Sequence, residues 1–227
     1  MLDAFCETAD NVSKCNKEGG GMMASVEKVT QVTHNRFLNY FELGTLKRTG
    51  EPGTYYMASR AADVKDLDLV TGVNTPNGVV IFSLYGEKKD RVVLVKQFRY
   101  PIADFVYELP AGLIEPGENY REAAVREMRE ETGTLFCPLD VDPMFERPFY
   151  NTVGMTDESC NLVYGTCEGE VSNAGLEDTE ELEVVLADRA EVFRILKEER
   201  VAANCAYMLM HFLREKEDPF AFLCVKP

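Results

Sequence analysis

The sequence predicts an α/β fold, and three observations support this prediction. Short apolar stretches typical of strands recur between residues 26 and 118 and again between residues 142 and 187. One strongly helical segment, residues 119–132, interrupts them, and two more helical patterns close the chain at 188–199 and 201–216. Strands and helices that follow one another in this way are typical of a sheet packed against helices.

The chain is expected to have three parts. Residues 1–24 end in a run of three glycines and show no sustained period, so we expect a mobile or loosely packed lead. Residues 25–72 alternate strand patterns with turns and predict a small antiparallel β unit. Residues 73–227 carry the helical patterns and predict the main domain.

The strands of the β unit are expected at 26–33, 39–48 and 54–61, with a turn at 49–53. In the main domain, residues 78–101 read as two strands around a polar turn, and residues 105–118 as a strand that runs into a loop. Further strands are expected at 142–149, 160–171 and 181–187.

The helix over residues 119–132 has clear start and stop signals. Asn119 is a suitable N-cap, and Gly133 can adopt the left-handed conformation that ends a helix. Ala124, Val125 and Met128 form an apolar stripe along it, which predicts that this side packs against the sheet.

Three carboxylates lie on a neighbouring side of the same helix. Glu127, Glu130 and Glu131 fall within an arc about 100° wide at the helical repeat. Like charges so close repel each other unless a cation lies between them. Hard oxygen donors at this spacing suit Mg²⁺ or Mn²⁺, whereas His34 and His211 are distant in sequence, which disfavours zinc.

Composition excludes several classes of protein. The formal net charge of −15 argues against broad electrostatic binding to nucleic acid or anionic lipid. The longest apolar stretches are too short to cross a membrane, and no signal-peptide pattern opens the sequence. These features favour a small diffusible substrate.

The cysteines predict neither a disulfide framework nor a metal site. They follow no C-x-x-C spacing, and their number is odd, so we expect reduced thiols in a cytoplasmic protein. The seven positions are Cys6, Cys15, Cys137, Cys160, Cys167, Cys205 and Cys224.

Residues 112–134, "GLIEPGENYREAAVREMREETGT", fit the pattern G-x5-E-x7-R-E-U-x-E-E-x-G-U, in which U is a bulky aliphatic residue. Eight of the nine specified positions match in register, and Thr134 departs at the last one. This segment resembles the signature box of the Nudix hydrolases. The resemblance implies an α/β/α sandwich and hydrolysis of a diphosphate that links a nucleoside to another group.

The resemblance also implies roles for individual residues. Glu127, Glu130 and Glu131 would bind the metal with the backbone carbonyl of Ala111, and Glu127 and Glu131 would also serve in catalysis. Glu118 and Arg126 would form the structural ion pair of the box. The implied cofactor is Mg²⁺, with Mn²⁺ as a substitute.

Outside the box, "VKQFRYP", "YELPAGLIE" and the N-terminal β unit resemble the ADP-ribose pyrophosphatase branch. This branch forms dimers through its N-terminal strands, so a homodimer is implied. Arg99 would grip the substrate phosphates and Glu108 would lie near the metals or the terminal ribose. Arg60 is a second candidate phosphate contact, and Phe37 or Tyr55 a candidate for stacking on a purine.

The general base of this branch is often found on a loop after the box. Here "VGMTDES", residues 153–159, resembles that loop, and Glu158 is the candidate base. Val153 stands where the branch has proline, which leaves the substrate open between ADP-ribose, a GDP- or UDP-sugar and other diphosphates. A Nudix-fold nucleotide sensor without activity is the alternative from another class.

Overall fold

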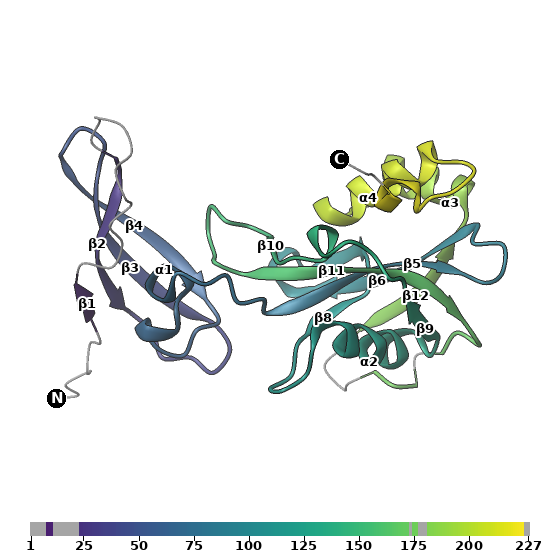
Figure 1. Cartoon of the computed structure of the whole chain (residues 1–227), viewed down its shortest axis with the longest axis horizontal. Helices are drawn as coiled ribbons and strands as arrows, with labels where there is room; N and C mark the ends of the chain where they lie inside the picture. Colours follow the sequence, from purple (N-terminus) through teal and green to yellow (C-terminus); the bar gives the residue numbers. More distant parts are fainter. Residues whose placement is uncertain (1–7, 11–22, 173, 177–180, 225–227) are drawn as a thin grey trace. The chain divides into compact units, whose positions relative to one another are not determined.

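The computed structural model describes residues 8–10, 23–172, 174–176 and 181–224 (Figure 1). The chain forms two compact units. The first comprises Met1–Asn77 and Pro148–Ser159, and the second comprises Gly78–Arg147 and Cys160–Pro227. The segment Pro148–Ser159 therefore groups with the N-terminal unit, although the sequence prediction assigned it to the main domain 73–227.

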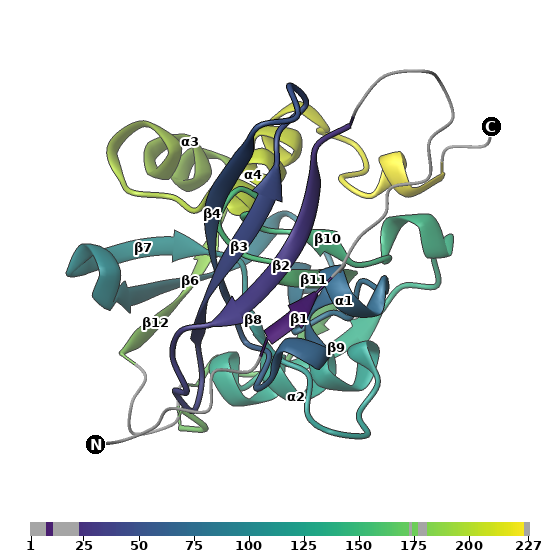
Figure 2. The same cartoon turned by 90° about the vertical axis from the view of Figure 1, so that its left-hand side faces the viewer.

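The first unit is built on an antiparallel sheet in the order β1-β2-β3-β4, and its strands run side by side in Figure 2. Burial alternates along β3, as expected for a sheet with one covered face. Phe41 of β3, Val29 of β2 and Leu67 are fully buried and form the centre of this core. The elements are β1 (Thr8–Asp10), β2 (Ser25–Gln31), β3 (Asn39–Leu46), β4 (Pro52–Ser59), η1 (Val64–Asp66), α1 (Asp68–Thr71) and β10 (Phe149–Tyr150).

The predicted lead 1–24 lies mostly outside the described residues. Thr8–Asp10 form the short strand β1, which pairs with β2. Cys6 and Cys15 lie in the part that is not described. The other five cysteines, all in the described part of the chain, form no disulfide bond.

The second unit is a mixed sheet with the central order β11-β5-β6-β12. β11 runs parallel to β5, whereas β7 pairs with β6, β8 with β5 and β9 with β11 in antiparallel fashion. The strands are β5 (Gly78–Tyr85), β6 (Arg91–Arg99), β7 (Asp104–Glu108), β8 (Ala111–Leu113), β9 (Leu135–Pro138), β11 (Ser159–Glu168) and β12 (Leu182–Ala187).

Helices cover both faces of this sheet. α2 (Tyr120–Thr132) lies on one face, and α3 (Arg189–Glu198) and α4 (Ala203–Arg214) lie on the other (Figure 1). Alternate residues of the strands enter the two cores, so that Leu94 packs with α3 and α4 while Val93 packs with α2. The α/β/α sandwich with a small antiparallel N-terminal β unit is thus confirmed.

Two local predictions were wrong. A strand was expected over 142–149, but Asp142 caps the short helix η3 (Pro143–Phe145) and only Phe149 and Tyr150 are extended. Proline lacks the N–H that a strand needs, and Pro143 and Pro148 flank this stretch. Val125 was expected in the buried stripe of α2 but is 40% exposed.

The buried side of α2 includes Ala124 and Met128, as predicted, together with Ala123. Ala123, Ala124 and Met128 are fully buried, and Glu131 and Thr132 continue the same side. Among the described residues, no helix combines the length and the apolar character needed to cross a lipid bilayer.

Candidate active site

The box helix α2 is fixed at both ends by local interactions. The side chain of Asn119 accepts the backbone N–H groups of Arg121 and Glu122, each at 3.0 Å. The Glu122 carboxylate accepts the Asn119 N–H in return at 3.2 Å, which completes a capping box. At the other end Gly133 has φ 73°, the left-handed conformation predicted for it. The carboxylates of the helix therefore have a well-defined frame.

Arg126 joins this helix to the preceding loop. Its Nε and Nη2 donate to the two carboxylate oxygens of Glu118 at 3.0 and 2.9 Å, and Nη2 also donates to the Leu113 carbonyl at 2.9 Å. The planar guanidinium suits such a two-pronged contact. Hydrogen bonding to Arg126 lowers the pKa of Glu118, while Glu118 raises the pKa of Arg126. Arg126 and Glu118 thus form the ion pair that the box resemblance implies.

Arg126 also contacts two of the candidate metal ligands. Its Nη1 donates to Glu127 at 2.8 Å and to Glu130 at 2.9 Å. One guanidinium therefore bonds to three carboxylates and offsets part of their mutual repulsion, which helps like charges to share this side of the helix. Glu130 remains about half exposed, whereas the Glu127 side chain is largely covered.

Glu131 and Gly112 bring the helix against the loop. Glu131 is 3% exposed, and its Oε2 accepts the Ala111 N–H at 3.3 Å. Glu127 lies so close to Gly112 that a Cβ at position 112 would overlap its carboxyl group. The first glycine of the box is therefore required for space, to let the loop backbone approach the carboxylates.

The residues fit a hard divalent cation by their chemistry. Glu127, Glu130, Glu131 and the Ala111 carbonyl offer only oxygen donors, which Mg²⁺ prefers. Within the described ranges no three acidic, imidazole or thiol groups are already gathered around one point. Glu127 and Glu130 face Arg126 instead, and a cation would compete with that guanidinium for them.

Thr134, the departure from the box pattern, is fully buried and hydrogen bonded. Its hydroxyl lies 2.7 Å from that of Thr132, and it also bonds to the Cys167 thiol. Burial raises the pKa of the Cys167 thiol. A hydroxyl in place of a methyl group is tolerated here because it has partners.

Arg99 and Glu108, both predicted to contact substrate, form an ion pair on neighbouring strands. Arg99 Nε lies 2.6 Å from Glu108 Oε2 at the end of β6. The Arg99 side chain is 46% exposed, which leaves part of its guanidinium open to a ligand. The structure brings these two residues together in the second unit, which also contains the box.

The remaining predicted residues belong to the first unit. Arg60 Nε lies 2.8 Å from Glu158 Oε1, and the Tyr55 hydroxyl donates to the Gly154 carbonyl at 2.5 Å. The loop that carries Glu158 is thus held against β4. Phe37 lies apart from them in contact with Arg36, with its side chain 65% exposed.

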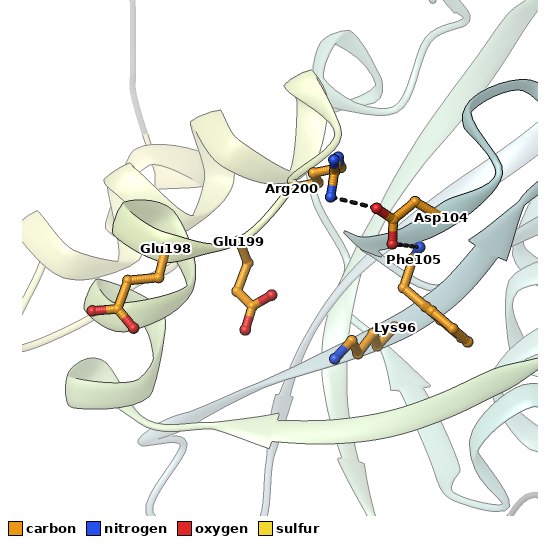
Figure 3. A pocket seen from close by; sticks show the side chains of 6 residues that line it. All are labelled: Lys96, Asp104, Phe105, Glu198, Glu199 and Arg200. Atoms are coloured by element: carbon orange, nitrogen blue, oxygen red, sulfur yellow. Dashed lines mark hydrogen bonds and ion pairs between the residues drawn. The ribbon is translucent and has the colours of Figure 1, made fainter.

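Two of the cavities among the described residues lie outside the box. One of about 400 Å³ is in the first unit, between Tyr55, Leu69 and Met155. The other, of about 340 Å³, is in the second unit (Figure 3), where Lys96 and Glu199 line the space beside an Arg200–Asp104 ion pair of 2.5 Å. The sequence predicted neither cavity, since each is lined by residues from separate segments of the chain.

Sequence reasoning also missed a buried carboxylate. Glu146 is 2% exposed and accepts hydrogen bonds from Tyr120 and Arg121 at the start of α2. A glutamate in a loop gives no sequence signal of burial, because acidic side chains are almost always exposed.

Comparison with known proteins shows which family the chain resembles. A model of the NUDIX domain matches residues 74–209. The chain is 30% identical over 166 residues to an ADP-ribose pyrophosphatase of Bacillus subtilis strain 168, which covers 68% of this chain and 84% of that protein. It is 28% identical over 162 residues to the methanol dehydrogenase activator of Bacillus methanolicus, with the same two coverages of 68% and 84%.

A solved crystal structure of an ADP compounds hydrolase has the same fold. It matches with a TM-score of 0.60 at 18% identity, over 87% of this chain and 95% of that one. The family match spans more than half of the sequence and includes the whole box. The chain therefore belongs to the Nudix hydrolase family and is similar to its ADP-ribose pyrophosphatases.

Proposed function

We propose that this protein hydrolyses the diphosphate bond of ADP-ribose to give AMP and ribose 5-phosphate, or that of a closely related nucleoside diphosphate sugar to give the corresponding nucleoside monophosphate and sugar phosphate. The observation that carries the proposal is the box itself. Arg126 ties the helix to the loop through Glu118, and Glu131 packs against the backbone of Ala111. The similarity to an ADP-ribose pyrophosphatase over most of the chain supports the substrate class.

Glu127, Glu130, Glu131 and the Ala111 carbonyl would hold Mg²⁺, with Mn²⁺ as a substitute. A divalent cation supplies neutralisation of the diphosphate charge and lowers the pKa of an attacking water. Glu127 and Glu130 would have to turn their side chains from Arg126 toward the metal, which they can do by changing rotamer while the helix backbone stays in place.

Arg99 would bind the phosphates with the part of its guanidinium that Glu108 leaves free. Glu108 accepts a hydrogen bond from Arg99 and so orients the guanidinium. Glu108 itself would lie near the metals or the terminal ribose. Arg60 would be a second phosphate contact or would orient Glu158. Phe37 or Tyr55 would stack on the base.

Glu158 would take the proton from the attacking water. A general base must come within hydrogen-bond reach of that water in the substrate complex. The Arg60 ion pair limits the orientations of the carboxylate and so supports this role. We also propose a homodimer, on the resemblance to the ADP-ribose pyrophosphatase branch. We propose a cytoplasmic location as well, which agrees with five described cysteines that form no disulfide bond.

The experiment is a product analysis of the purified protein with Mg²⁺ against ADP-ribose, ADP-glucose, GDP-mannose, UDP-glucose, NADH and diadenosine polyphosphates. AMP and ribose 5-phosphate from ADP-ribose at the highest kcat/KM are expected. Glu131→Gln should lower kcat by about 10²- to 10³-fold, whereas Glu87→Gln, in an exposed hairpin turn, should not change it. A higher kcat/KM for a GDP- or UDP-sugar would make that compound the substrate and leave the proposed reaction unchanged. If none of the compounds were cleaved, a nucleotide sensor without activity would be favoured.

A further inference from the structure

Glu146 is a buried carboxylate outside the box that serves no role described so far. Its side chain is 1% exposed. Oε2 accepts three hydrogen bonds, from Arg121 Nη2 at 2.6 Å, Arg121 Nε at 3.0 Å and the Tyr120 hydroxyl at 3.0 Å. Oε1 is buried as well, with no hydrogen-bond partner in the part of the chain that the structure describes. Burying a carboxylate costs free energy unless hydrogen bonds compensate, so the three bonds to Oε2 hold the Glu146 side chain in one orientation.

The donors of Glu146 belong to the helix that carries the candidate metal ligands. Tyr120 and Arg121 are the first two residues of α2, and Glu127 follows less than two turns later. Hydrogen bonding to Glu146 raises the pKa of Arg121, so this guanidinium stays charged. The side chain of Glu146 is therefore fixed to the start of α2.

The backbone of Glu146 is fixed to β11 at the same time. Its carbonyl accepts the side-chain amide of Asn161 at 2.5 Å, and Asn161 is 4% exposed. Glu146 and Asn161 flank the segment that leaves the second unit at Arg147 and returns at Cys160. One residue thus joins both ends of that segment to α2.

The segment between these ends carries Glu158, three residues before Asn161. Within this segment the Asn151 N–H donates to the Glu158 carbonyl at 3.0 Å, so the beginning and the end of the segment are hydrogen bonded to each other. Fixing the ends of a segment reduces the conformations open to it. A base whose position is defined to within about 1 Å can be worth about 10² in rate.

We propose that Glu146 is a positioning residue for the hydrolysis: it holds both stems of the Glu158 segment on the N-terminus of the metal-binding helix. The proposal rests on the proposed function, because it takes Glu158 as the general base. Glu146 touches neither substrate nor metal in this scheme and acts through Glu158.

The test is Glu146→Gln, which keeps the shape and one acceptor for Tyr120 and Arg121 but removes the charge. We expect kcat for ADP-ribose to fall about tenfold, with KM and the Kd for Mn²⁺ both within about twofold. In a Glu158→Gln background the same substitution should have no further effect on kcat, because its effect passes through Glu158. Glu199→Gln is the matched control, since the Glu199 carboxylate lies 2.6 Å from Arg194, in an ion pair that includes none of the partners of Glu146.

A second measurement does not depend on activity. Amide hydrogen exchange across residues 148–159 should speed up in Glu146→Gln, while residues 122–132 of α2 stay as protected as before. If Glu146→Gln does not fold, as judged by circular dichroism and Tm, Arg121→Lys replaces it, because it keeps the positive charge but loses the two-pronged contact.

The proposal would be overturned if kcat were unchanged in Glu146→Gln, or if Glu199→Gln lowered kcat as much. It would also be overturned if the losses from Glu146→Gln and Glu158→Gln multiplied in the double variant, or if amide exchange in residues 148–159 were unchanged in Glu146→Gln. Failure of the proposed function looks different. Wild-type kcat in Glu158→Gln alone would overturn the assignment of the base, and no cleavage by the wild-type protein would overturn the activity.

Discussion

Arg60 and Glu158, which lie 98 residues apart in the sequence, form an ion pair with 2.8 Å between Nε and Oε1. One was predicted from sequence as a phosphate contact and the other as the general base. Their pairing in the first unit means that a change to either residue alters the surroundings of the other.

Arg60→Gln is expected to lower kcat about tenfold, because the Glu158 carboxylate loses the group that orients it. The free energy of unfolding should change by less than about 1 kcal/mol, since both side chains are about one third exposed and such pairs contribute little to stability. Steady-state kinetics and urea unfolding measure the two effects. Arg48→Gln, at an exposed turn, is the control, and equal kcat in the two variants would contradict the prediction.

Gly112→Ala is expected to weaken metal binding and lower kcat/KM about 100-fold, because the new Cβ would displace the Glu127 carboxylate from the loop. Isothermal titration with Mn²⁺ and kinetics with ADP-ribose measure these effects. Gly44→Ala is the matched control, because a Cβ at position 44 has its nearest neighbour at 3.4 Å, in β2. Wild-type Mn²⁺ affinity in Gly112→Ala would show that the close approach at Gly112 is not needed.

Arg99→Lys is expected to raise KM for ADP-ribose about tenfold with kcat within about twofold, since a lysine cannot bind Glu108 and a phosphate with one planar group. The measurement is a kinetic comparison at saturating Mg²⁺. Arg91→Lys serves as the control, because Arg91 is similarly exposed at the start of the same strand. A fall in kcat with KM unchanged would mean that Arg99 acts on the transition state alone.

The Glu118–Arg126 pair predicts a pH dependence of stability. The pKa of Glu118 is lowered from its ordinary value of 4.5, first of all by the hydrogen bond from Arg126. A lowered folded-state pKa means that the pair stabilises the fold above about pH 4.5, and that this contribution is lost as the pH falls through the lower folded-state pKa.

Urea unfolding between pH 6 and pH 3 should therefore show wild type more stable than Glu118→Gln at pH 6, with the gap closing toward pH 3. The Gln variant removes the titrating group and keeps its size. A gap that stays constant across this range would mean that Glu118 stabilises the fold by packing and not by charge.

Much of the box could be predicted because its signals are local. The cap at Asn119, the left-handed Gly133 and the Glu118–Arg126 pair all depend on residues within a few helical turns of one another. The same holds for α3 and α4, whose apolar residues repeat at three and four.

The rest depends on contacts between distant parts of the chain. The Arg60–Glu158 pair and the burial of Glu146 arise from tertiary packing, which a single sequence does not display. The burial of Val125 was predicted wrongly for a different reason. An apolar residue at the border of a helical stripe can face the core or the solvent, and here Ala123 is buried whereas Val125 is exposed.

The first unit is discontinuous in sequence, and this affects how the protein is made. Backbone and side-chain bonds from Ala58, Tyr55 and Arg60 of the N-terminal part all end on the segment Pro148–Ser159. During synthesis that segment leaves the ribosome only after the box helix has emerged. The N-terminal unit therefore cannot complete its fold until much of the second unit has been translated. A fragment that stops at Asn77 would lack these contacts.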